Sequence, residues 1–352
     1  MLVKEADAAR EAGRLEEAER LYRQVLHQRP RWAPGWGHLG TMAYERDRFR
    51  ECRVAFRRLV ELEPASGPGW ALGGLCEFGL QAYEASRRSL DRALERGGLP
   101  DATLLPVVLY HQALLRIRAA EYEAAIPPLA QLATASPETA DLVTACGLLL
   151  LRRPLLPADV PPGDRELVSR SGRAYCAYLA RRAGEARARF VELLAQYPSQ
   201  EHLHYGYGLF LAQQTDAEAA SQFRKEIELH PRHVLAHLEL AFELLRRGDA
   251  EGAIAPARVA TKLAPGLFAA HLALGRALVA SGQLGAGIRE LEAAARLAPG
   301  VSETFRALAN AYERAGRKLD AERARGTVHR LDKLAEARRT RAVAEPAAPA
   351  KP

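Results

Sequence analysis

Histidines are the residues of this sequence with the most versatile chemistry, and three of them fall within the short range 230–237. The interval from His237 to His271 equals the interval from Trp36 to Trp70. A metal site needs three or four side chains that converge on one point. Histidines that alternate with tryptophans at a recurring position instead favour packing between helices. We therefore predict packing roles for these histidines and no metal site.

No short motif of the sequence supports catalysis. The phosphate-binding pattern G-x-x-x-x-G-K-[ST], the nucleophile pattern G-x-S-x-G and the zinc-protease pattern H-E-x-x-H are all missing. A G-x-G-x-x-G pattern runs from Gly35 to Gly40, but a dinucleotide site needs a strand before these glycines, and no strand pattern precedes them. The sequence predicts a protein that is not an enzyme and that needs no cofactor.

Composition indicates the structural class. Ala and Leu dominate the 48% of hydrophobic residues, aromatic residues make up 7%, and no sustained run has the alternation of a strand. An all-α protein is therefore expected. Four cysteines, at positions 52, 76, 146 and 176, stand singly with no C-x-x-C pair, which indicates small buried side chains in the reduced thiol state.

Charge and hydropathy set expectations for partners and compartment. The net charge is +7 over 352 residues, and Arg alternates with Glu, which favours a solvated outer face over a nucleic-acid surface. The preference for Arg, the abundant Ala and the single Asn are typical of GC-rich, bacterial coding. No apolar run could span a membrane and no signal segment is visible. A cytoplasmic location is expected, with export as the alternative if an N-terminal signal has been lost.

A proline that recurs at a nearly fixed interval sets the positions of the expected elements. The prolines are Pro30, Pro64, Pro137, Pro198, Pro231, Pro265 and Pro299. Four of the intervals between neighbours have the same length to within one position, and a helix-compatible stretch precedes each proline. Because proline cannot extend the helix before it, each one closes a unit. A period of about 34 residues indicates a stacked array of helix pairs.

The repeating unit resembles the tetratricopeptide repeat, whose signature of about 34 residues is W-x2-L-G-x2-Y followed by A, F, A and P. The best match, in 33–66, has Trp36, Leu39, Gly40, Tyr44, Phe56 and Pro64. Further segments match at 1–32, 67–100, 106–139, 167–199, 200–233, 234–267, 268–301 and 302–335. Segment 200–233 matches through Gly206, Phe223 and Pro231. The resemblance implies a right-handed α-α superhelix, a solenoid, of about nine helix-turn-helix repeats.

Interruptions of the period predict the domain organisation. An N-terminal array of about four repeats is expected at 1–139, an irregular helix plus a Pro-rich loop at 140–166, a C-terminal array of about five repeats at 167–335 and a disordered tail at 336–352. Four prolines between 154 and 162 forbid a second helix in the junction. The junction is either a degenerate repeat or a hinge.

The resemblance also suggests where a ligand would bind, because first helices of tetratricopeptide repeats line a concave groove that holds a peptide or a partner helix. The groove residues expected from this alignment are Tyr44, Tyr110, His111, Tyr175, Tyr178, His204, Tyr205 and Phe242. Tyr and His suit such a surface because the ring is apolar and its edge is polar. The C-terminal end of the groove turns polar at Arg276, Arg306, Asn310, Glu313 and Arg314.

The sequence therefore predicts a non-enzymatic scaffold that binds a protein or peptide segment in the groove. A nucleic-acid partner is disfavoured, no membrane partner is expected, and self-association through the ends of the array is an option. Two alternatives remain open. One is a repeat protein that binds nucleic acid through a basic face, which would use Arg276, Arg306, Arg314 and the Arg-rich segment 323–341. The other is a non-catalytic regulatory subunit of an enzyme complex.

Overall fold

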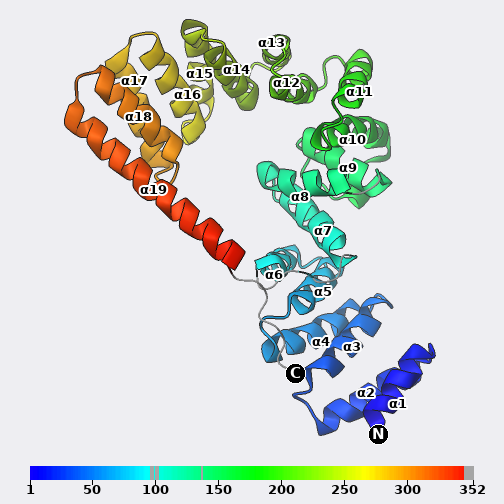
Figure 1. The fold of residues 1–352 in the computed structure, drawn as a ribbon. Helices are drawn as coiled ribbons and strands as arrows, with labels where there is room; N and C mark the ends of the chain where they lie inside the picture. The colour runs from blue at the N-terminus through cyan, green and yellow to red at the C-terminus, as the bar shows by residue number, and fades with distance from the viewer. Residues whose placement is uncertain (96–98, 100–102, 136–137, 345–352) are drawn as a thin grey trace. The chain divides into compact units, whose positions relative to one another are not determined.

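The computed structural model describes residues 1–95, 99, 103–135 and 138–344, and within them the chain forms nineteen α-helices, two 3-10 helices and no strand. The chain is all-α, as its composition and repeats predict. Its helices divide into two compact units, of which unit 1 ends at Arg165 and unit 2 begins at Glu166. Figure 1 labels the helices of both units along the chain.

Unit 1 consists of four helix pairs, then one further helix and two 3-10 turns. Its elements are α1 (Leu2–Glu11), α2 (Leu15–Gln28), α3 (Ala33–Tyr44), α4 (Phe49–Leu62), α5 (Gly67–Gly79), α6 (Tyr83–Glu95), α7 (Leu104–Arg118), α8 (Tyr122–Ala135), α9 (Ala140–Leu150), η1 (Pro157–Asp159) and η2 (Pro162–Asp164). Pro137, one of the recurring prolines, lies outside the described residues.

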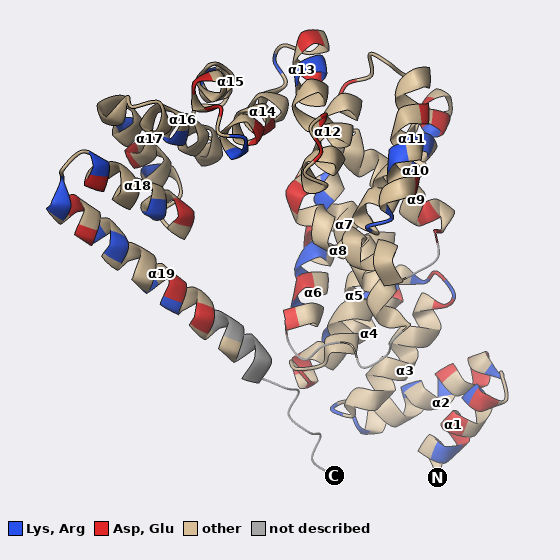
Figure 2. Ribbon diagram, turned by 45° about the horizontal axis from the view of Figure 1, so that its top comes forward, with Lys and Arg blue, Asp and Glu red and all other residues tan. Residues whose placement is uncertain are grey.

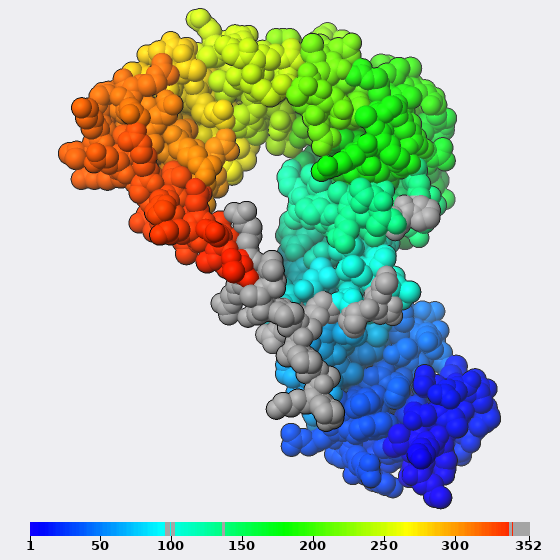
Figure 3. Space-filling model, in the orientation of Figure 1, coloured from blue at the N-terminus to red at the C-terminus, as the bar shows by residue number. Residues whose placement is uncertain are grey.

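Unit 2 consists of five helix pairs. They are α10 (Arg165–Leu179) with α11 (Ala183–Gln196), α12 (Leu203–Gln213) with α13 (Ala219–Leu229), α14 (Val234–Arg246) with α15 (Ala250–Leu263), α16 (Phe268–Ala280) with α17 (Leu284–Leu297), and α18 (Ser302–Arg314) with α19 (Lys318–Ala344). Within each unit, helices contact their neighbours in the sequence, and the gradual change of colour in Figure 3 follows this order. Contacts between sequence neighbours are the arrangement of a repeat array.

The two helices of a pair approach each other through one small and one large residue. A Cβ atom placed on Gly40 would lie 2.6 Å from the Phe56 ring, so only glycine allows α3 to reach α4 there. The same relation holds between Gly208 and Phe223, again at 2.6 Å. In segment 200–233 the small residue that faces the large one is therefore Gly208, which lies on α12.

Each turn within a pair contains a residue in the left-handed region of φ. These residues are Gly13, Asp47, Gln81, Ala120, Arg181, Thr215, Gly248, Gly282 and Gly316. Glycine adopts this conformation without cost, whereas another residue loses about 1 kcal/mol. Five of the nine turns are made without glycine, which is why glycine alone does not reveal the period in the sequence.

The junction after α9 contains no second α-helix, but its residues are not simply extended. Leu156 and Val160, which flank η1, are buried at 7% and 4% exposure, and η1 contacts α9. The Tyr122 hydroxyl donates to the Arg152 carbonyl at 2.6 Å. Arg153 forms an ion pair with Asp164 at 2.5 Å. The Pro-rich segment therefore covers α9 with apolar side chains in place of a helix.

Two further expectations differ from the structure. Cys52 of α4 and Cys76 of α5 are both fully buried and are paired as a disulfide, with Cα atoms 6.0 Å apart, so four reduced thiols were the wrong expectation. Helix α19 continues to Ala344, beyond the point at 336 where a disordered tail was expected. The residues from 336 to 344 are rich in Ala and Arg, which favour helix, and the first proline comes only at 346.

Candidate functional site

A recurring hydrogen bond explains why histidine and tryptophan share one position in the repeats. In five repeats the ring N–H of this residue donates to the carbonyl of the proline that closes the preceding repeat. The pairs are Trp36–Pro30 (2.9 Å), Trp70–Pro64 (3.0 Å), His204–Pro198 (3.2 Å), His237–Pro231 (2.9 Å) and His271–Pro265 (3.0 Å). The indole of tryptophan and the imidazole of histidine each place an N–H within hydrogen-bond distance of this carbonyl. These histidines therefore pack between repeats, as predicted for His237 and His271.

His204 belongs to this packing position rather than to an open groove. Its second ring nitrogen, Nδ1, lies 2.7 Å from the side-chain oxygen of Gln222 on α13. Both nitrogens are therefore engaged within the array. A ligand could contact only the remaining exposed part of the His204 ring, and its role as a ligand-binding residue stays a prediction.

A buried glutamate holds the start of α12. Glu226 of α13 has no exposed surface and accepts hydrogen bonds from the backbone N–H groups of His202, at 2.7 Å, and Tyr205, at 3.0 Å. These two N–H groups belong to the N-terminus of α12, whose first turn contains no acidic residue of its own. Burial raises the pKa of Glu226, and the two backbone hydrogen bonds oppose that rise.

Beside this glutamate, Glu201, His202 and His233 place three possible metal-ligand atoms within 4.8 Å of one another. The hydrogen bonds argue against a metal ion there. His233 Nδ1 accepts from the backbone N–H of Ala236 at 3.0 Å, so in the neutral ring Nε2 carries the proton. That Nε2–H points at Nδ1 of His202, 2.7 Å away. Both ring nitrogens of His233 are thus engaged, and the cluster is a capping network for α12 and α14.

The predicted groove residues of unit 1 lie half-buried on α3 and α7. Tyr44 meets the ring of Phe49 edge-on, with centroids 6.2 Å apart. His111 meets Phe78 at 4.7 Å, and its Nδ1–H donates to the Val107 carbonyl at 2.8 Å. Burial lowers the pKa of His111. The ring of Tyr110 lies edge-on to His111, and burial raises the pKa of its hydroxyl, with a smaller effect from the charge of Asp141. His111 therefore packs between the first helices α5 and α7, whereas Tyr44 packs against the second helix α4 of its own pair.

The predicted groove residues of unit 2 differ from one another in exposure. Tyr175 is buried, at 4%, whereas Tyr178, Tyr205 and Phe242 are half-buried. Tyr178 lies edge-on to Tyr175, with centroids 5.3 Å apart. Tyr205 packs against His233 at 5.0 Å. Tyr175 therefore belongs to the core, and the other three side chains keep part of their surface accessible.

Glu239 of α14 lies near these rings and has no hydrogen bond or ion pair to any described residue. Burial raises its pKa to about 7, and the charge of Glu243 adds to the rise. The charge of Glu239 in turn adds to the effect of burial in raising the pKa of Tyr178. Glu243, one turn further along α14, is itself bridged by Arg246 and Arg247, each at 2.5 Å. Within the described part of the chain, Glu239 is thus a carboxylate without a cation partner on the first-helix side of unit 2.

The first helices α14, α16 and α18, together with Leu291 of α17, surround a polar pocket of about 440 Å³. The repeat interval places Phe242, Arg276 and Asn310 at one position of α14, α16 and α18. The pocket, which we call the first-helix pocket, is lined by Leu245, Arg276, Val279, Ala280, Leu291, Glu303, Arg306, Ala307, Asn310 and Arg314. Of the polar residues predicted at the C-terminal end of the groove, Arg276, Arg306, Asn310 and Arg314 line this pocket, whereas Glu313 does not.

Half of the donors of this pocket are already engaged. Arg276 pairs with Glu303 at 2.8 Å and Arg306 pairs with Asp332 of α19 at 2.7 Å. The amide of Asn310 and the guanidinium of Arg314 have no partner among the described residues. Basic and acidic residues are interspersed along α19 (Figure 2), so that helix does not present a surface of one sign. The pocket therefore offers unused donors in a small area.

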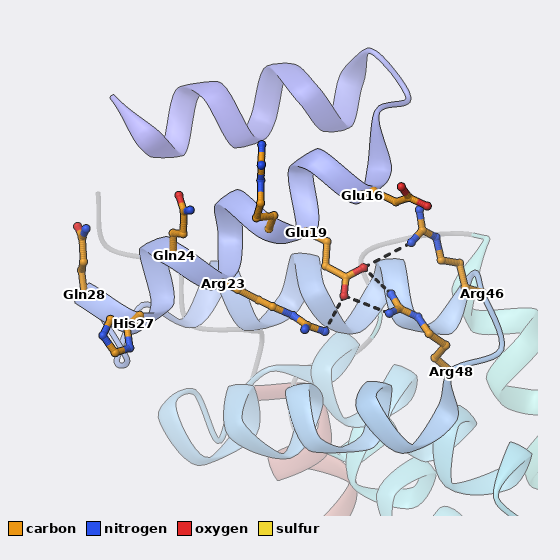
Figure 4. A pocket seen from close by; sticks show the side chains of 9 residues that line it. Glu16, Glu19, Arg23, Gln24, His27, Gln28, Arg46 and Arg48 are labelled. Carbon is orange, nitrogen blue, oxygen red and sulfur yellow. Dashed lines mark hydrogen bonds and ion pairs between the residues drawn. The ribbon is translucent and has the colours of Figure 1, made fainter.

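Two further pockets lie along the second helix α2 of unit 1, where no binding residue was predicted. The first, of about 690 Å³, surrounds Glu19 of α2, whose carboxylate pairs with Arg23 at 2.6 Å, Arg48 at 2.7 Å and Arg46 at 3.4 Å (Figure 4). The hydrogen bond with Arg48 is the main cause that lowers the pKa of Glu19. The second, of about 680 Å³, shares Glu19 and Arg23 but has an apolar floor.

The apolar floor consists of Leu26, Pro30, Trp36, Leu39, Val54 and Ala55. We call these two adjoining pockets together the second-helix groove. A signal for it exists in the sequence of α4, FRECRVAFRR, where Val54 stands between arginines at a position that helix packing does not bury. In the structure Val54 is 61% exposed.

The repeats belong to a known family. The model of the family described as tetratricopeptide repeat matches residues 3–67, which contain α2 to α4, and residues 217–267, which contain α13 to α15. Ring-to-proline hydrogen bonds recur in both matched segments. The chain is a tetratricopeptide repeat protein. Within the described residues, no helix combines the length and the apolar character that a membrane span requires.

Several solved structures align with parts of the chain. MamA from Desulfovibrio magneticus RS-1 is 24% identical, covers 44% of this chain and 89% of its own, with a TM-score of 0.42. YrrB, described as a TPR protein with an unusual peptide-binding site, is 18% identical over 45% of this chain and 82% of its own, with a TM-score of 0.41. Yeast Tom70 is 16% identical over 94% and 68%, with a TM-score of 0.36. None of the curated proteins matches the chain. The family assignment rests on the family model.

Proposed function

We propose that the chain is a non-catalytic interaction scaffold and that unit 2 binds a protein segment along its first helices α14, α16 and α18. One observation carries this proposal: Asn310 and Arg314, whose donors have no partner among the described residues, share the first-helix pocket with Arg276. Unused donors around a concavity are the feature that a ligand would satisfy. Tetratricopeptide repeat proteins are generally scaffolds without catalytic activity, which agrees with the lack of a catalytic motif in this sequence.

The chemistry of the surface indicates what kind of segment it would take. An acidic side chain or a terminal carboxylate would accept hydrogen bonds from Arg314 and Asn310, because charge-assisted hydrogen bonds to guanidinium are strong and directional. Apolar side chains would cover Phe242 and Leu245. A basic group further along the segment would neutralise Glu239. The ligand we expect is therefore a segment with a basic residue, an apolar stretch and an acidic residue, and no bond is made or broken.

A peptide library tests this proposal. The full chain is incubated with an array of random 12-residue peptides, and binding is compared between the wild type, Arg314→Glu and Arg258→Glu. Arg258 is exposed on the second helix α15, so the control makes the same charge change outside the pocket. We expect the wild type to select peptides with an acidic residue. Arg314→Glu should lower the affinity for these peptides about tenfold, and Arg258→Glu should leave that affinity unchanged. Equal losses in both variants, or selection without any preference for acid, would refute the assignment.

A further inference from the structure

The second-helix groove of unit 1 lies in a different unit and on different helices from the proposed binding surface of unit 2. We propose that this groove docks an amphipathic helix of a partner protein, with its apolar face on the floor and acidic side chains along its flanks. Three properties of the groove support this occupant: an apolar floor, walls that offer no backbone groups, and arginines on the rim without an ion-pair partner among the described residues.

The floor exposes apolar surface within a concavity. Val54 is 61% exposed, and Trp36 and Leu39 are half-buried beside it, in a pocket of about 680 Å³. A single exposed valine on a convex surface needs no explanation, whereas an apolar side chain inside a concavity is a place where a partner's side chain can be buried. Several leucine-sized side chains are therefore expected to enter from the partner.

The walls favour a helical occupant over an extended one. The groove lies between α2 and α4, whose backbone N–H and C=O groups are used within the helices. An extended peptide on this floor would bury backbone groups without hydrogen-bond partners, which is costly. A helix satisfies its own backbone and presents side chains at i, i+3, i+4 and i+7. The lining residues on α2 run from Glu16 to Gln28, which at 1.5 Å per residue is about 18 Å, or three turns of a docked helix.

The rim favours acidic flanks. Glu19 and Glu51 are already paired, since Arg23 bridges the two carboxylates at 2.6 and 2.8 Å. Arg20 and Arg50, on the α2 and α4 walls of the groove, have no ion-pair partner among the described residues. An excess of positive charge on both walls attracts acids on both flanks of a docked helix. A nucleic-acid strand would also meet these arginines, but it would leave the apolar floor uncovered, so we favour the helix.

Binding of designed peptides to the full chain tests this proposal. The probe is a fluorescein-labelled 18-residue helix with leucines at i, i+3, i+4 and i+7 and glutamates on the flanks. One control peptide keeps the leucines and carries lysines on the flanks, and another keeps the leucines and glutamates but has a central proline that breaks the helix. Fluorescence anisotropy measures the affinity of each. We expect the acidic helix to bind at least tenfold more tightly than either control.

Two matched variants locate the site. Val54→Glu places a like charge on the floor, and Val191→Glu makes the same change at a valine that is 54% exposed on α11. Because both valines are exposed, neither variant should unfold the chain. We expect Val54→Glu to lower the affinity for the acidic helix about tenfold and Val191→Glu to change this affinity less than twofold. The proposal is overturned if Val54→Glu binds like wild type, if the proline peptide or the lysine peptide binds as well as the acidic helix, or if a short RNA duplex displaces the bound helix.

Discussion

Glu19 in unit 1 and Glu239 in unit 2 are two partly buried carboxylates beside candidate binding surfaces, and their surroundings are opposite. Three arginines contact Glu19, which lowers its pKa, whereas Glu239 has no cation among the described residues and its pKa rises to about 7. The comparison shows that the charge of Glu19 is balanced within the protein, although arginines on the rim of the same groove have no ion-pair partner among the described residues. Charge along the first helices of unit 2 is not balanced, and a ligand could balance it. The predictions below test this difference.

The largest effect is expected at Glu19. Glu19→Gln removes the charge that three arginines share, and the loss of these charge-assisted hydrogen bonds should lower the unfolding free energy by about 2.5 kcal/mol. The control is Glu16→Gln. Glu16 lies on the same helix and lines the same pocket, but it forms no ion pair with a described residue. Urea unfolding, monitored by hydrogen exchange in α2 to α4, measures the unfolding free energy of both variants. If Glu19→Gln lowers the unfolding free energy no more than Glu16→Gln does, the ion pairs of Glu19 with the three arginines do not stabilise unit 1.

The same comparison predicts opposite responses to pH. A carboxylate whose pKa is lowered by folding contributes stability above its ordinary value of 4.5, and this contribution disappears as pH falls through the lower folded value. A carboxylate whose pKa is raised, as in Glu239, makes the folded state less stable as pH rises from about 4.5 through about 7. We therefore expect unit 1 to lose stability in acid and Glu239 to weaken unit 2 above neutral pH.

Glu239→Gln tests the second half of this prediction. The neutral side chain should raise the unfolding free energy of unit 2 by about 2 kcal/mol at pH 8 and leave it almost unchanged at pH 5. The control Glu251→Gln alters an exposed residue of α15 and should show no dependence on pH. Chemical unfolding at several pH values provides the measurement. A gain that is equal at pH 5 and pH 8 would mean that the charge of Glu239 costs nothing.

A smaller effect is expected from the ring-to-proline hydrogen bond. Trp36→Phe removes the N–H that reaches the Pro30 carbonyl, which should cost about 1 kcal/mol more than Trp32→Phe, because the Trp32 indole N–H makes no such bond in the described structure. Trp36→His should recover part of the loss, since histidine makes this bond at three positions of unit 2. Thermal unfolding compares the three variants. If Trp36→His is less stable than Trp36→Phe, the two rings are not interchangeable.

The smallest effect is expected in the turns. Most turns of unit 1 place a non-glycine residue at positive φ, as at Ala120, while the last three turns of unit 2 use glycine, as at Gly282. Ala120→Gly should therefore stabilise unit 1 by about 0.5 kcal/mol, and Gly282→Ala should destabilise unit 2 by about 1 kcal/mol. Differential scanning calorimetry detects both. Shifts of the same sign would rule out strain in these turns.

Much of the fold follows from the sequence because the repeat is a local feature. Proline after each second helix, and small residues opposite large ones, predict the helix pairs without any long-range information. In segment 200–233, Gly206 matches the repeat pattern, but Gly208 is the glycine that faces Phe223, and only the structure distinguishes the two. The pairing of Cys52 with Cys76 was missed because it depends on two helices of successive repeats, which spacing alone does not bring together.

The candidate sites were less predictable. Aromatic residues on first helices were assigned to a groove, but Tyr175 is buried and His204 makes two hydrogen bonds within the array, and neither fact is visible from residue type. The second-helix groove depends on the gap between α2 and α4, which has no sequence pattern of its own. The absence of a described cation beside Glu239 likewise depends on which side chains reach it.

Hydrogen–deuterium exchange of the full chain, with and without the strongest peptide selected from the library, tests the central claim most directly. We expect slower exchange in the first helices α14, α16 and α18 when the peptide is bound, and no change in the second helices α13 and α15, which contribute no residue to the pocket and serve as internal controls. Protection that is confined to α2 and α4, or that is equal in first and second helices of unit 2, would contradict the account.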